Sequence, residues 1–246
     1  MQDGGESVKG IDVSIVIPVY NEEGLLATAV RDLLGQLEPI PLVFEVILSE
    51  NGSKDHTREI ADELSKTRNN VRVLHSDQPN YGLAMRRGIE EARGRICICD
   101  EIDLCDVDFH GRAIELLTSG QADMVVGSKR HPEARDRRPA LRRFATGVIN
   151  LMLRIFLGFR GTDTHGLKAF NREKILPVLA LCVVEKDLFA SELVIRAERA
   201  GVNVVEVPLD IAEKRPPSIN LFKRVPNVLR NLWKLFLVIR LGRKPR

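Results

Sequence analysis

The stretch "VSIVIPVY", residues 13–20, decides the fold of this chain. It is a short β-branched run without charges, which favours a buried strand. Apolar residues then recur at helical spacing over residues 22–37. The alternation continues, with strands expected at 43–49, 71–76, 95–100 and 123–127 and helices at 55–67 and 82–93. Strands that alternate with helices indicate βαβ crossovers, and therefore an α/β fold with a mainly parallel sheet flanked by helices.

Polar residues follow three of these expected strands at the point where each strand ends. They occupy Tyr20 to Glu23, Glu50 to Asp55 and Asp100 to Asp103. The carboxyl ends of parallel strands meet at one edge of a sheet, where ligands of open α/β folds bind. The sequence therefore predicts a ligand site on this edge.

The second half of the chain continues the fold with less regular signals. A basic, Pro-containing loop at 128–143 is expected to open a helix at 140–158. A turn into a short strand (161–173), a helix (188–201) and an edge strand (202–211) follow. We expect one domain over residues 11–212, after a disordered N-terminus at 1–10 without a secretory signal.

The charge of the chain is divided unevenly. Of 246 residues, 44% are hydrophobic and 29% are charged, which is ordinary for a globular protein. The tail from Lys214 to Arg246 holds ten Lys and Arg and no Asp or Glu, which leaves 27 of the 37 basic residues against all 34 acidic residues elsewhere. A basic tail on an acidic body indicates an anionic surface as partner.

The tail at 213–246 is also amphipathic. Residues 219–241 are apolar at helical spacing, and the longest unbroken apolar run is Leu235 to Ile239. A membrane-spanning helix needs roughly 18 to 20 apolar residues, so we expect no crossing. The helix either packs on the body or lies in a membrane interface with Trp233 at the acyl boundary. The absence of acids favours the interface, and the mixture of bases with large aliphatics argues against nucleic acid.

The stretch "ICICDEIDLCD", residues 96–106, brings carboxylates to the end of a buried strand. Glu101 and Asp103 are two apart and point to the same side of an extended segment, whereas Asp100 points to the other. Such a pair suits a hard divalent cation that shares substrate phosphates, although a solvated acidic turn explains it equally well. Cys97 and Cys99 fit buried thiols in a reducing cytosol.

Four motifs stand in order at the expected strand ends: "VSIVIPVYNEE" (13–23), "SENGSKDHT" (49–57), "NYGLAMRRGIEEARG" (80–94) and "EIDL" (101–104). Together they resemble the family 2 glycosyltransferases, which have a GT-A (Rossmann-like) fold and use nucleotide-diphosphate sugars. The resemblance runs from about Val13 to Ile211. It implies an inverting transfer of a hexose from a GDP- or UDP-sugar.

The resemblance also implies residue roles. A nucleotide pocket would be lined by Pro18, Tyr20 and Glu22, with Glu50 reading the base and Ser53 in the same loop. Next to the ribose and phosphate would lie Asn80 and Gly82. In "EIDL", Glu101 would lie near ribose or metal, and Asp103 would bind Mg²⁺ or Mn²⁺ directly. The family usually has Asp where this chain has Glu50 and Glu101, which puts the ligand geometry and the base preference in question.

The acceptor is suggested by a second group of motifs. Residues 127–130, 141–150 and 163–170 resemble dolichyl- and polyprenyl-phosphate mannosyl- and glucosyltransferases, with Lys129 where Arg is usual and His165 where Cys or Ser is common. A lipid phosphate would be held by a basic set, and Asp163 would contact acceptor or sugar. The basic set is Lys129, Arg142, Arg143 and Lys168.

The mechanism depends on the acceptor. Relatives that glycosylate hydroxyls have a Glu-Asp pair, with the Asp as base, where this register gives Phe189 and Ala190. A hydroxyl needs a general base, whereas a lipid phosphate is already ionised at pH 7. We therefore expect a peripheral enzyme on the cytoplasmic membrane face that can assemble as a homo-oligomer. The alternatives are a saccharide or small hydroxyl acceptor, with Asp163 as base, and a non-catalytic nucleotide-sugar-binding protein.

Overall fold

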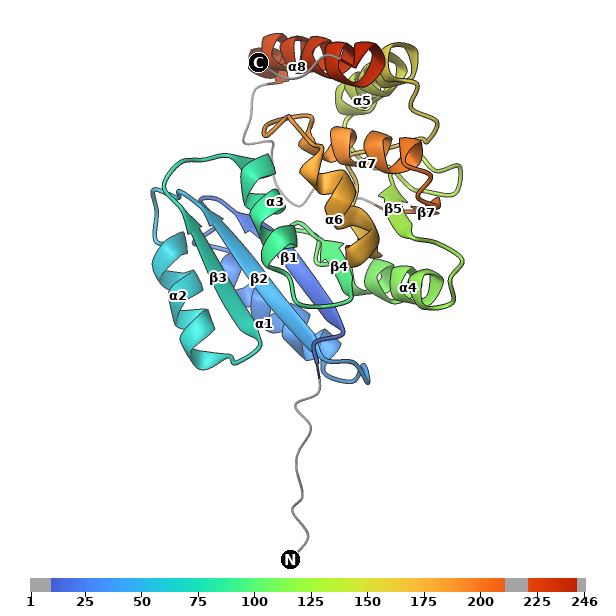
Figure 1. The fold of residues 1–246 in the computed structure, drawn as a ribbon. Coiled ribbons are helices and arrows are strands. Elements are labelled where there is room, and N and C mark those ends of the chain that lie inside the picture. Colours follow the sequence, from blue (N-terminus) through green and yellow to red (C-terminus); the bar gives the residue numbers. More distant parts are fainter. Residues whose placement is uncertain (1–9, 211–220, 243–246) are drawn as a thin grey trace, which may run out of the picture.

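The computed structural model describes residues 10–210 and 221–242, with only the backbone described in 221–225. Within these residues, one sheet has the strand order β3-β2-β1-β4-β6-β5-β7 (Figure 1). Every neighbouring pair is parallel except those that involve β6. The strands are β1 Val13–Val19, β2 Phe44–Asn51, β3 Val71–Ser76, β4 Ile96–Cys99, β5 Met124–Ser128, β6 Lys168–Asn171 and β7 Val204–Pro208.

Helices cover both faces of the sheet. One face packs against α1 Leu26–Leu37, α2 Thr57–Thr67 and α4 Val107–Thr118. The other packs against α3 Tyr81–Glu91, α6 Arg172–Ala180 and α7 Phe189–Arg199. Because both faces are covered, the central strands are buried throughout: all eight residues of β2 are buried. The expected α/β architecture with flanking helices is confirmed.

A third group of helices lies at one end of the molecule (Figure 1). It contains α5 Ala140–Met152 with its π-helical continuation η1 Leu153–Leu157, and α8 Leu221–Leu235 with its continuation η2 Phe236–Arg240. The rings of Phe156 and Phe236 meet edge to face at 6.2 Å. Leu232 and Leu235 are buried against the body, so α8 is packed on the domain. On the same helix Trp233 is 60% exposed, and the membrane-interface interpretation of the tail stays a prediction.

The structure adds elements that the sequence pattern did not indicate. Helices α4 and α6 fall in stretches for which no helix was predicted, and the first predicted helix begins only at Leu26, after a turn in which Leu25 and Leu26 donate to the Glu22 carbonyl. The predicted disordered terminus at 1–10 lies outside the described residues except for Gly10. The tail is described only within 221–242.

Candidate active site

The predicted edge of the sheet is present. In the strand registers Val19 pairs with Glu50, and Glu50 pairs with His75. Val16 pairs with Cys99, and the backbone N–H of Asp100 extends that ladder by donating to the Val16 carbonyl at 3.0 Å. The segments that follow β1, β2 and β4 therefore emerge side by side, as the alternation of strands and helices predicted.

The loops after β1 and β2 are tied to each other by reciprocal hydrogen bonds. The Asn21 N–H donates to the Ser53 Oγ at 3.1 Å, and the Lys54 N–H donates to the Asn21 Oδ1 at 2.9 Å. The Glu22 N–H donates to the Thr57 Oγ1 at 2.7 Å. Asn21 takes a left-handed backbone with φ of 54°, which asparagine tolerates better than most residues. Glu22 and Ser53, both predicted to line the nucleotide pocket, are thereby held close together.

Two predicted pocket residues come from the end of β1. Pro18 pairs with Ser49 in the sheet and is half-buried. Tyr20 follows the last residue of the strand and is 38% exposed. Its ring is thus available on the edge where a base or ribose would lie.

Glu50 is buried under the loop that follows β2 and holds the backbone of that loop in place. Its side chain is fully buried, and its Oε1 accepts the Ser53 N–H at 2.6 Å. Its Oε2 lies 3.4 Å from the Nδ1 of His75, whose Nε2 lies 2.9 Å from the Asp62 Oδ1. These contacts give Glu50 a role in shaping the loop, and base reading stays a prediction.

Asn80 and Gly82 form a helix start instead of an isolated turn. Asn80 caps α3, since its Oδ1 accepts the Leu83 N–H at 3.2 Å, and its own N–H donates to the Asn51 Oδ1 at 2.6 Å. A Cβ on Gly82 would lie 2.0 Å from the Glu185 carbonyl oxygen. Gly82 is therefore required for close packing against the segment before α7.

The carboxylate turn after β4 is compact. The Glu101 carbonyl accepts the N–H of Leu104 at 2.9 Å and that of Cys105 at 3.1 Å. Burial raises the pKa of the Glu101 carboxyl, and Asp103 adds to this, whereas Lys129 acts in the opposite direction. A buried carboxylate with a raised pKa is stabilised by an added positive charge.

The two carboxylates fit a divalent cation. Among the residues that the structure describes, no group of three or more His, Cys, Asp and Glu side chains could hold a metal. Glu101 and Asp103 lie close enough for Asp103 to raise the pKa of Glu101, and two such oxygen donors would suit Mg²⁺ or Mn²⁺ if phosphate and water supplied the other ligands.

Lys168 reaches this edge because β6 is antiparallel. It is the first residue of β6, and it pairs with Cys99 of β4 and with Val126 of β5. The antiparallel direction brings the start of β6 to the carboxyl ends of both neighbours. Burial lowers the pKa of Lys168, and its Nζ donates to the Gly166 carbonyl at 2.7 Å.

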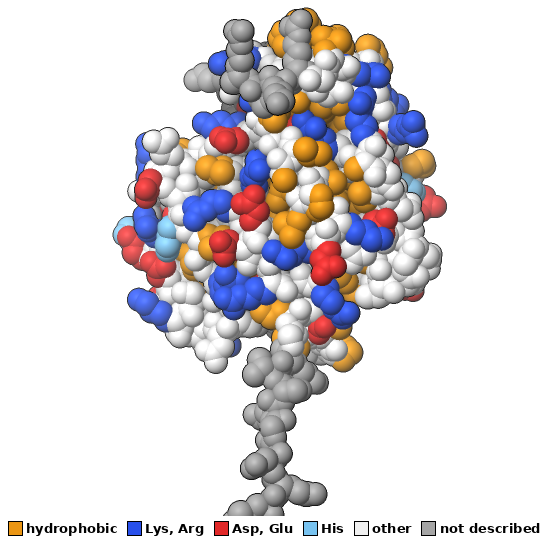
Figure 2. Space-filling model, viewed as in Figure 1, with side chains coloured by type: hydrophobic (Ala, Val, Ile, Leu, Met, Phe, Trp, Pro, Cys, Tyr) orange, Lys and Arg blue, Asp and Glu red, His pale blue; other side chains and the backbone are white. Residues whose placement is uncertain are grey.

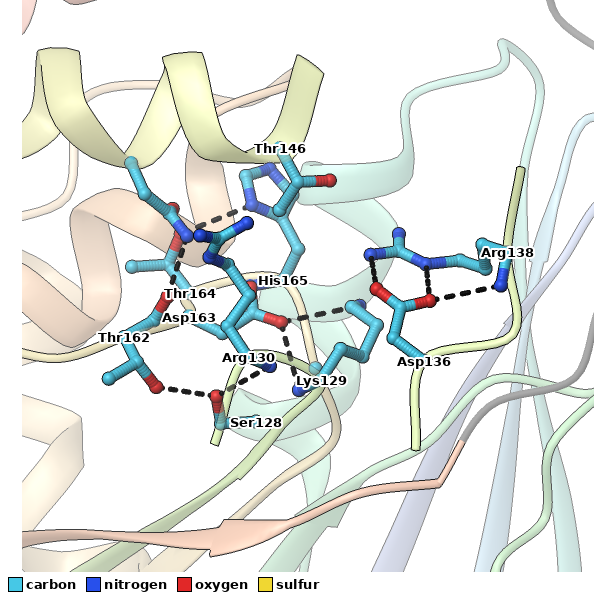
Figure 3. Close-up of polar contacts among 12 residues, drawn as sticks. Ser128, Lys129, Arg130, Asp136, Arg138, Thr146, Thr162, Asp163, Thr164 and His165 are labelled. Atoms are coloured by element: carbon cyan, nitrogen blue, oxygen red, sulfur yellow. Dashed lines mark hydrogen bonds and ion pairs between the residues drawn. The ribbon is translucent and has the colours of Figure 1, made fainter. Parts of the chain in front are cut away.

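Asp163 and Lys129 form a buried pair beside it (Figure 3). The Lys129 Nζ lies 3.7 Å from the Asp163 Oδ2, with side chains 9% and 0% exposed, and the His165 N–H donates to the other oxygen at 2.9 Å. Burial alone would raise the pKa of Asp163, but Lys129 and this N–H hold it below its ordinary value. Asp163 is therefore a fixed anion and a poor proton acceptor.

A glycine contact brings the two halves of this cluster together. A Cβ on Gly166 would lie 1.6 Å from the Gly127 carbonyl oxygen, so only glycine permits this approach. Beside it, the Thr162 hydroxyl lies 2.6 Å from the Ser128 hydroxyl (Figure 3). The Glu206 carboxylate of β7 accepts the Thr162 N–H at 2.6 Å. The motifs at 127–130 and 163–170 therefore meet in space.

Not every predicted basic residue joins the cluster. Arg143 is exposed on α5, and its carbonyl accepts a hydrogen bond from the Arg130 Nη1 at 3.4 Å. Arg142 instead lines a groove beside α5. Arg138 makes a bidentate pair with Asp136, with contacts of 2.9 and 2.8 Å. Asp103, Lys129, Asp163 and Lys168 are the predicted catalytic residues near Glu101, and Arg143 lies outside that group.

A groove of about 490 Å³ leads away from the cluster. His165 lies at its polar end, with Thr146 of α5 beside it (Figure 3). Burial lowers the pKa of His165 to about 4, against the opposing effect of Asp163. The walls are mainly apolar: Leu141, Phe144, Ala145, Val148, Ile149, Met152, Leu188, Val228 and Leu229.

Several structural contributors were missed by sequence reasoning. Asn51 links the β2 loop to Asn80, and its place in "ENGS" was the available signal. Glu206 of β7 and the pair of Asp100 with His110 carried no recognisable spacing. They are separated in sequence from the groups they support by up to 44 residues.

Two known proteins are similar to this chain in sequence. Glycosyltransferase AglD of Haloferax volcanii is 32% identical over 244 residues, covering 96% of this chain and 39% of AglD. A dolichyl-phosphate beta-glucosyltransferase (ALG5A) of Trichomonas vaginalis is 27% identical over 214 residues, covering 80% of this chain and 65% of that protein. This chain therefore spans less than two thirds of either relative.

The fold is confirmed by solved structures. Glucosyl-3-phosphoglycerate synthase from Mycobacterium tuberculosis, in complex with UDP, superposes with a TM-score of 0.66 at 21% identity, over 96% of this chain and 82% of that one. Its complex with Mn²⁺, UDP-glucose and phosphoglyceric acid gives 0.65 at 20% identity and the same coverage. The expected GT-A fold is thereby confirmed.

The family assignment rests on the sequence itself. The family model described as glycosyl transferase family 2 matches residues 14–178, which include the "NEE", "ENGS", "NYG" and "EIDL" motifs. The predicted resemblance, including that to the dolichyl-phosphate sugar transferases, is borne out. The chain belongs to glycosyl transferase family 2.

Proposed function

We propose that this glycosyltransferase moves a hexose from a nucleotide-diphosphate sugar to a polyprenyl-phosphate-type lipid, with inversion, on the cytoplasmic face of a membrane. The proposal rests mainly on two neighbouring features, the buried side chains of Lys129 and Lys168 and an apolar groove. Lys129 and Lys168 lie where the sheet edge ends, and the groove that starts at His165 runs between α5 and α8.

The acceptor side favours a phosphate over a hydroxyl. Its carboxylate, Asp163, has a lowered pKa and is paired with Lys129. Phe189 and Ala190 line a small cavity together with Glu101 and Lys168. A hydroxyl acceptor requires a base that can take a proton, whereas a phosphate brings its own negative oxygen. Buried ammonium groups complement that oxygen.

The groove matches a prenyl chain in chemistry. Its polar lining residues are Arg138, Arg142, Thr146, His165 and Asp187, and nine apolar side chains line the rest. A phosphate held at the polar end would leave its hydrocarbon chain along the apolar walls, where burial contributes about 25 cal/mol for each Å² removed from water. The dolichyl-phosphate glucosyltransferases among the relatives support this class of acceptor.

An apolar stripe on α5 and η1 supports action at a membrane surface. Five side chains that recur every three or four residues are between 39% and 70% exposed: Leu141, Phe144, Val148, Leu151 and Ile155. Figure 2 shows hydrophobic side chains, with Lys and Arg beside them, at the end of the molecule where α5 and α8 lie. Such a face suits a bilayer interface. No helix in the described part of the chain could span a bilayer.

The donor side would use a divalent cation. Glu101 and Asp103 would hold Mg²⁺ or Mn²⁺ together with the donor diphosphate, and the bound ion would stabilise the charge of the leaving nucleotide. Tyr20 and the β2 loop would hold the nucleoside, and Asn80 would orient the ribose end. The neighbouring synthase, crystallised with Mn²⁺ and UDP-glucose, supports this pairing of metal and donor.

The transfer is a single in-line displacement. An oxygen of the acceptor phosphate attacks the anomeric carbon, and the bond from that carbon to the donor diphosphate breaks. The electron pair of that bond leaves with the nucleoside diphosphate, and no proton is transferred. Lys129 and Lys168 position the attacking phosphate and offset its charge, so proximity and electrostatic preorganisation supply most of the rate.

The test is a transfer assay with matched acceptors. The purified chain is incubated with UDP- or GDP-[¹⁴C]hexose, Mn²⁺ and either polyprenyl phosphate or the unphosphorylated polyprenol, and the lipid is extracted. We expect label in the organic phase only with the phosphate, carrying an inverted anomeric centre by NMR.

Other results would replace the proposal. Label on an added saccharide but not on lipid would establish a hydroxyl acceptor, with Asp163 as the base to examine. Tight binding of a UDP- or GDP-sugar without turnover would indicate a nucleotide-sugar-binding protein.

A further inference from the structure

A buried His–Asp pair lies directly behind the carboxylate turn. The His110 Nε2 lies 2.5 Å from the Asp100 Oδ2, and both side chains are 0% exposed. His110 comes from the second turn of α4, and Asp100 follows β4. The motifs implied no role for either residue, and the structure turns one oxygen of Asp100 toward His110.

The second oxygen of Asp100 is used on the turn itself. Its Oδ1 accepts the backbone N–H of Glu101 at 2.7 Å. The Glu101 carbonyl is fixed from the other side by the N–H groups of Leu104 and Cys105. Both polar groups of the Glu101 backbone are therefore held, one by Asp100 and one by the turn that carries Asp103.

The helix that carries His110 is firmly anchored. Asp106 caps α4 by accepting the Phe109 N–H at 2.9 Å, and the His110 N–H donates to the Asp106 carbonyl at 3.1 Å. Phe109 is fully buried, and its ring packs under Gly127 at the end of β5. The start of α4, which carries the imidazole, is therefore held in place between the carboxylate turn and the end of β5, the strand that leads to Lys129.

The chemistry of the two side chains identifies the Nε2 of His110 as the donor to Asp100. An ionised carboxylate can only accept, so the Nε2 of His110 is the donor to Asp100. The Nδ1 of His110 has no hydrogen-bond partner among the described residues, although it is buried. A buried ring nitrogen without a partner lowers the stability of the fold, and the hydrogen bond from Nε2 to Asp100 is what offsets this cost.

We propose that His110 is a positioning residue for the cation and diphosphate turn, acting through Asp100. By donating to Asp100 it keeps that carboxylate buried and aimed at the Glu101 N–H, so that Glu101 and Asp103 are presented together. This inference rests on the proposed role of the turn in binding a divalent cation. Partners that orient metal-binding carboxylates act in this way in other proteins.

The experiment measures metal binding rather than turnover. Free Mn²⁺ is titrated by EPR with the full chain in the presence of UDP, for the wild type and for three variants. His110→Asn places an amide nitrogen where the Nδ1 stood and loses the donor to Asp100. His110→Gln places its amide nitrogen near the Nε2 position and retains that donor. Leu117→Ala creates a cavity in the buried face of the same helix.

We expect His110→Asn to weaken Mn²⁺ binding about 10- to 100-fold, as loss of such a supporting partner does. His110→Gln should restore most of the affinity. Leu117→Ala should lower the melting temperature and leave the Mn²⁺ affinity unchanged, because it destabilises α4 without touching Asp100. Equal affinities of His110→Asn and wild type, or equal weakening by Leu117→Ala, would overturn the proposal.

The outcomes also separate this inference from the proposed function. If the wild type binds no Mn²⁺ with UDP, the metal role and the role of His110 both fail. If Mn²⁺ binding depends on His110 but no label reaches lipid, the acceptor is wrong and the positioning role stands. If lipid transfer requires Mn²⁺ but His110→Asn binds it normally, only the inference fails.

Discussion

The proposed donor side and the proposed acceptor side of the site are held together by different interactions. On the donor side, the loops after β1 and β2 exchange backbone hydrogen bonds with side chains such as Asn21 and Ser53, all between neighbouring strands. On the acceptor side, a buried ion pair, Lys129 with Asp163, joins segments 34 residues apart.

Because of this difference, the two sides should respond differently to pH and to the loss of a side chain. Hydrogen bonds between backbone groups and uncharged side chains such as Asn21 and Ser53 do not titrate, so these contacts should change little with pH. Buried ionised groups are sensitive to loss of a partner and to protonation, because an unpaired charge in the interior is strongly unfavourable. Four predictions test this contrast, from the largest expected effect to the smallest.

Asp103→Ala should have the largest effect, on the donor side. We expect kcat/KM to fall about 1,000-fold, or about 4 kcal/mol, since a cation contributes several kcal/mol to a displacement of this kind. Steady-state transfer assays at varied Mn²⁺ check it. The matched control is Asp108→Ala, an exposed carboxylate on α4 whose side chain is 81% exposed. Equal activities for both variants would contradict the metal role.

Lys129→Met should act mainly on the acceptor side. It removes the ammonium beside Asp163, and we expect the KM for polyprenyl phosphate to rise by the equivalent of about 2 to 3 kcal/mol, the value of a charged hydrogen bond. The KM for the sugar nucleotide should change less, because Lys129 acts on Glu101 only through its charge. Lys129→Arg should retain activity, because the resembling enzymes have Arg there. Lys174→Ala, which breaks the pair with Asp123 outside the site, is the control.

His165 should make stability depend on pH. Its folded pKa of about 4 lies below the ordinary 6.5, so the unfolded chain takes up a proton first as the pH falls. Stability should therefore be lost between about pH 6.5 and 4, by about 2 kcal/mol after allowance for partial exposure. Asp163, with its lowered folded pKa, loses its contribution only below that window.

The measurement is urea unfolding from pH 7 to 4. His165→Gln should flatten the decline. His56→Gln is the control of opposite sign, because Glu23 raises the pKa of the exposed His56, whose contribution is present at low pH and is lost as the pH rises. A decline that is unchanged in His165→Gln would show that His165 is not its source.

The smallest expected effect concerns the apolar stripe of α5. Replacing Leu151 and Ile155, which are 56% and 64% exposed and do not line the groove, by Ser should lower partition into anionic vesicles at least about tenfold, since each large apolar side chain contributes about 1.5 to 3 kcal/mol when buried. Vesicle co-sedimentation measures it. Activity on a short-chain, water-soluble prenyl phosphate should be retained, whereas Leu181→Ser, exposed after α6, should leave partition unchanged. Unaltered partition of the double variant would remove the stripe from the membrane contact.

Prediction from sequence succeeded where neighbours in sequence are neighbours in space. The strand at 13–20 and its parallel partners set the edge on which Tyr20, Glu50 and Glu101 emerge, because each βαβ unit returns its next strand in the same direction. The same local logic predicted the helix at 140–158 and the edge strand near the end of the domain. It missed α4 and α6, whose packing against the sheet outweighs weak local signals.

The sequence alone determined the α/β class, the polar edge and the pair Glu101 and Asp103, because strand periodicity and loop position are local properties. Only the tertiary structure decided that β6 runs antiparallel between β4 and β5 and so brings Lys168 to that edge. It also decided that Gly166 meets Gly127, that Asp163 is paired with Lys129, and that His110 contacts Asp100. These contacts depend on long-range packing, which no spacing within a single stretch of sequence encodes.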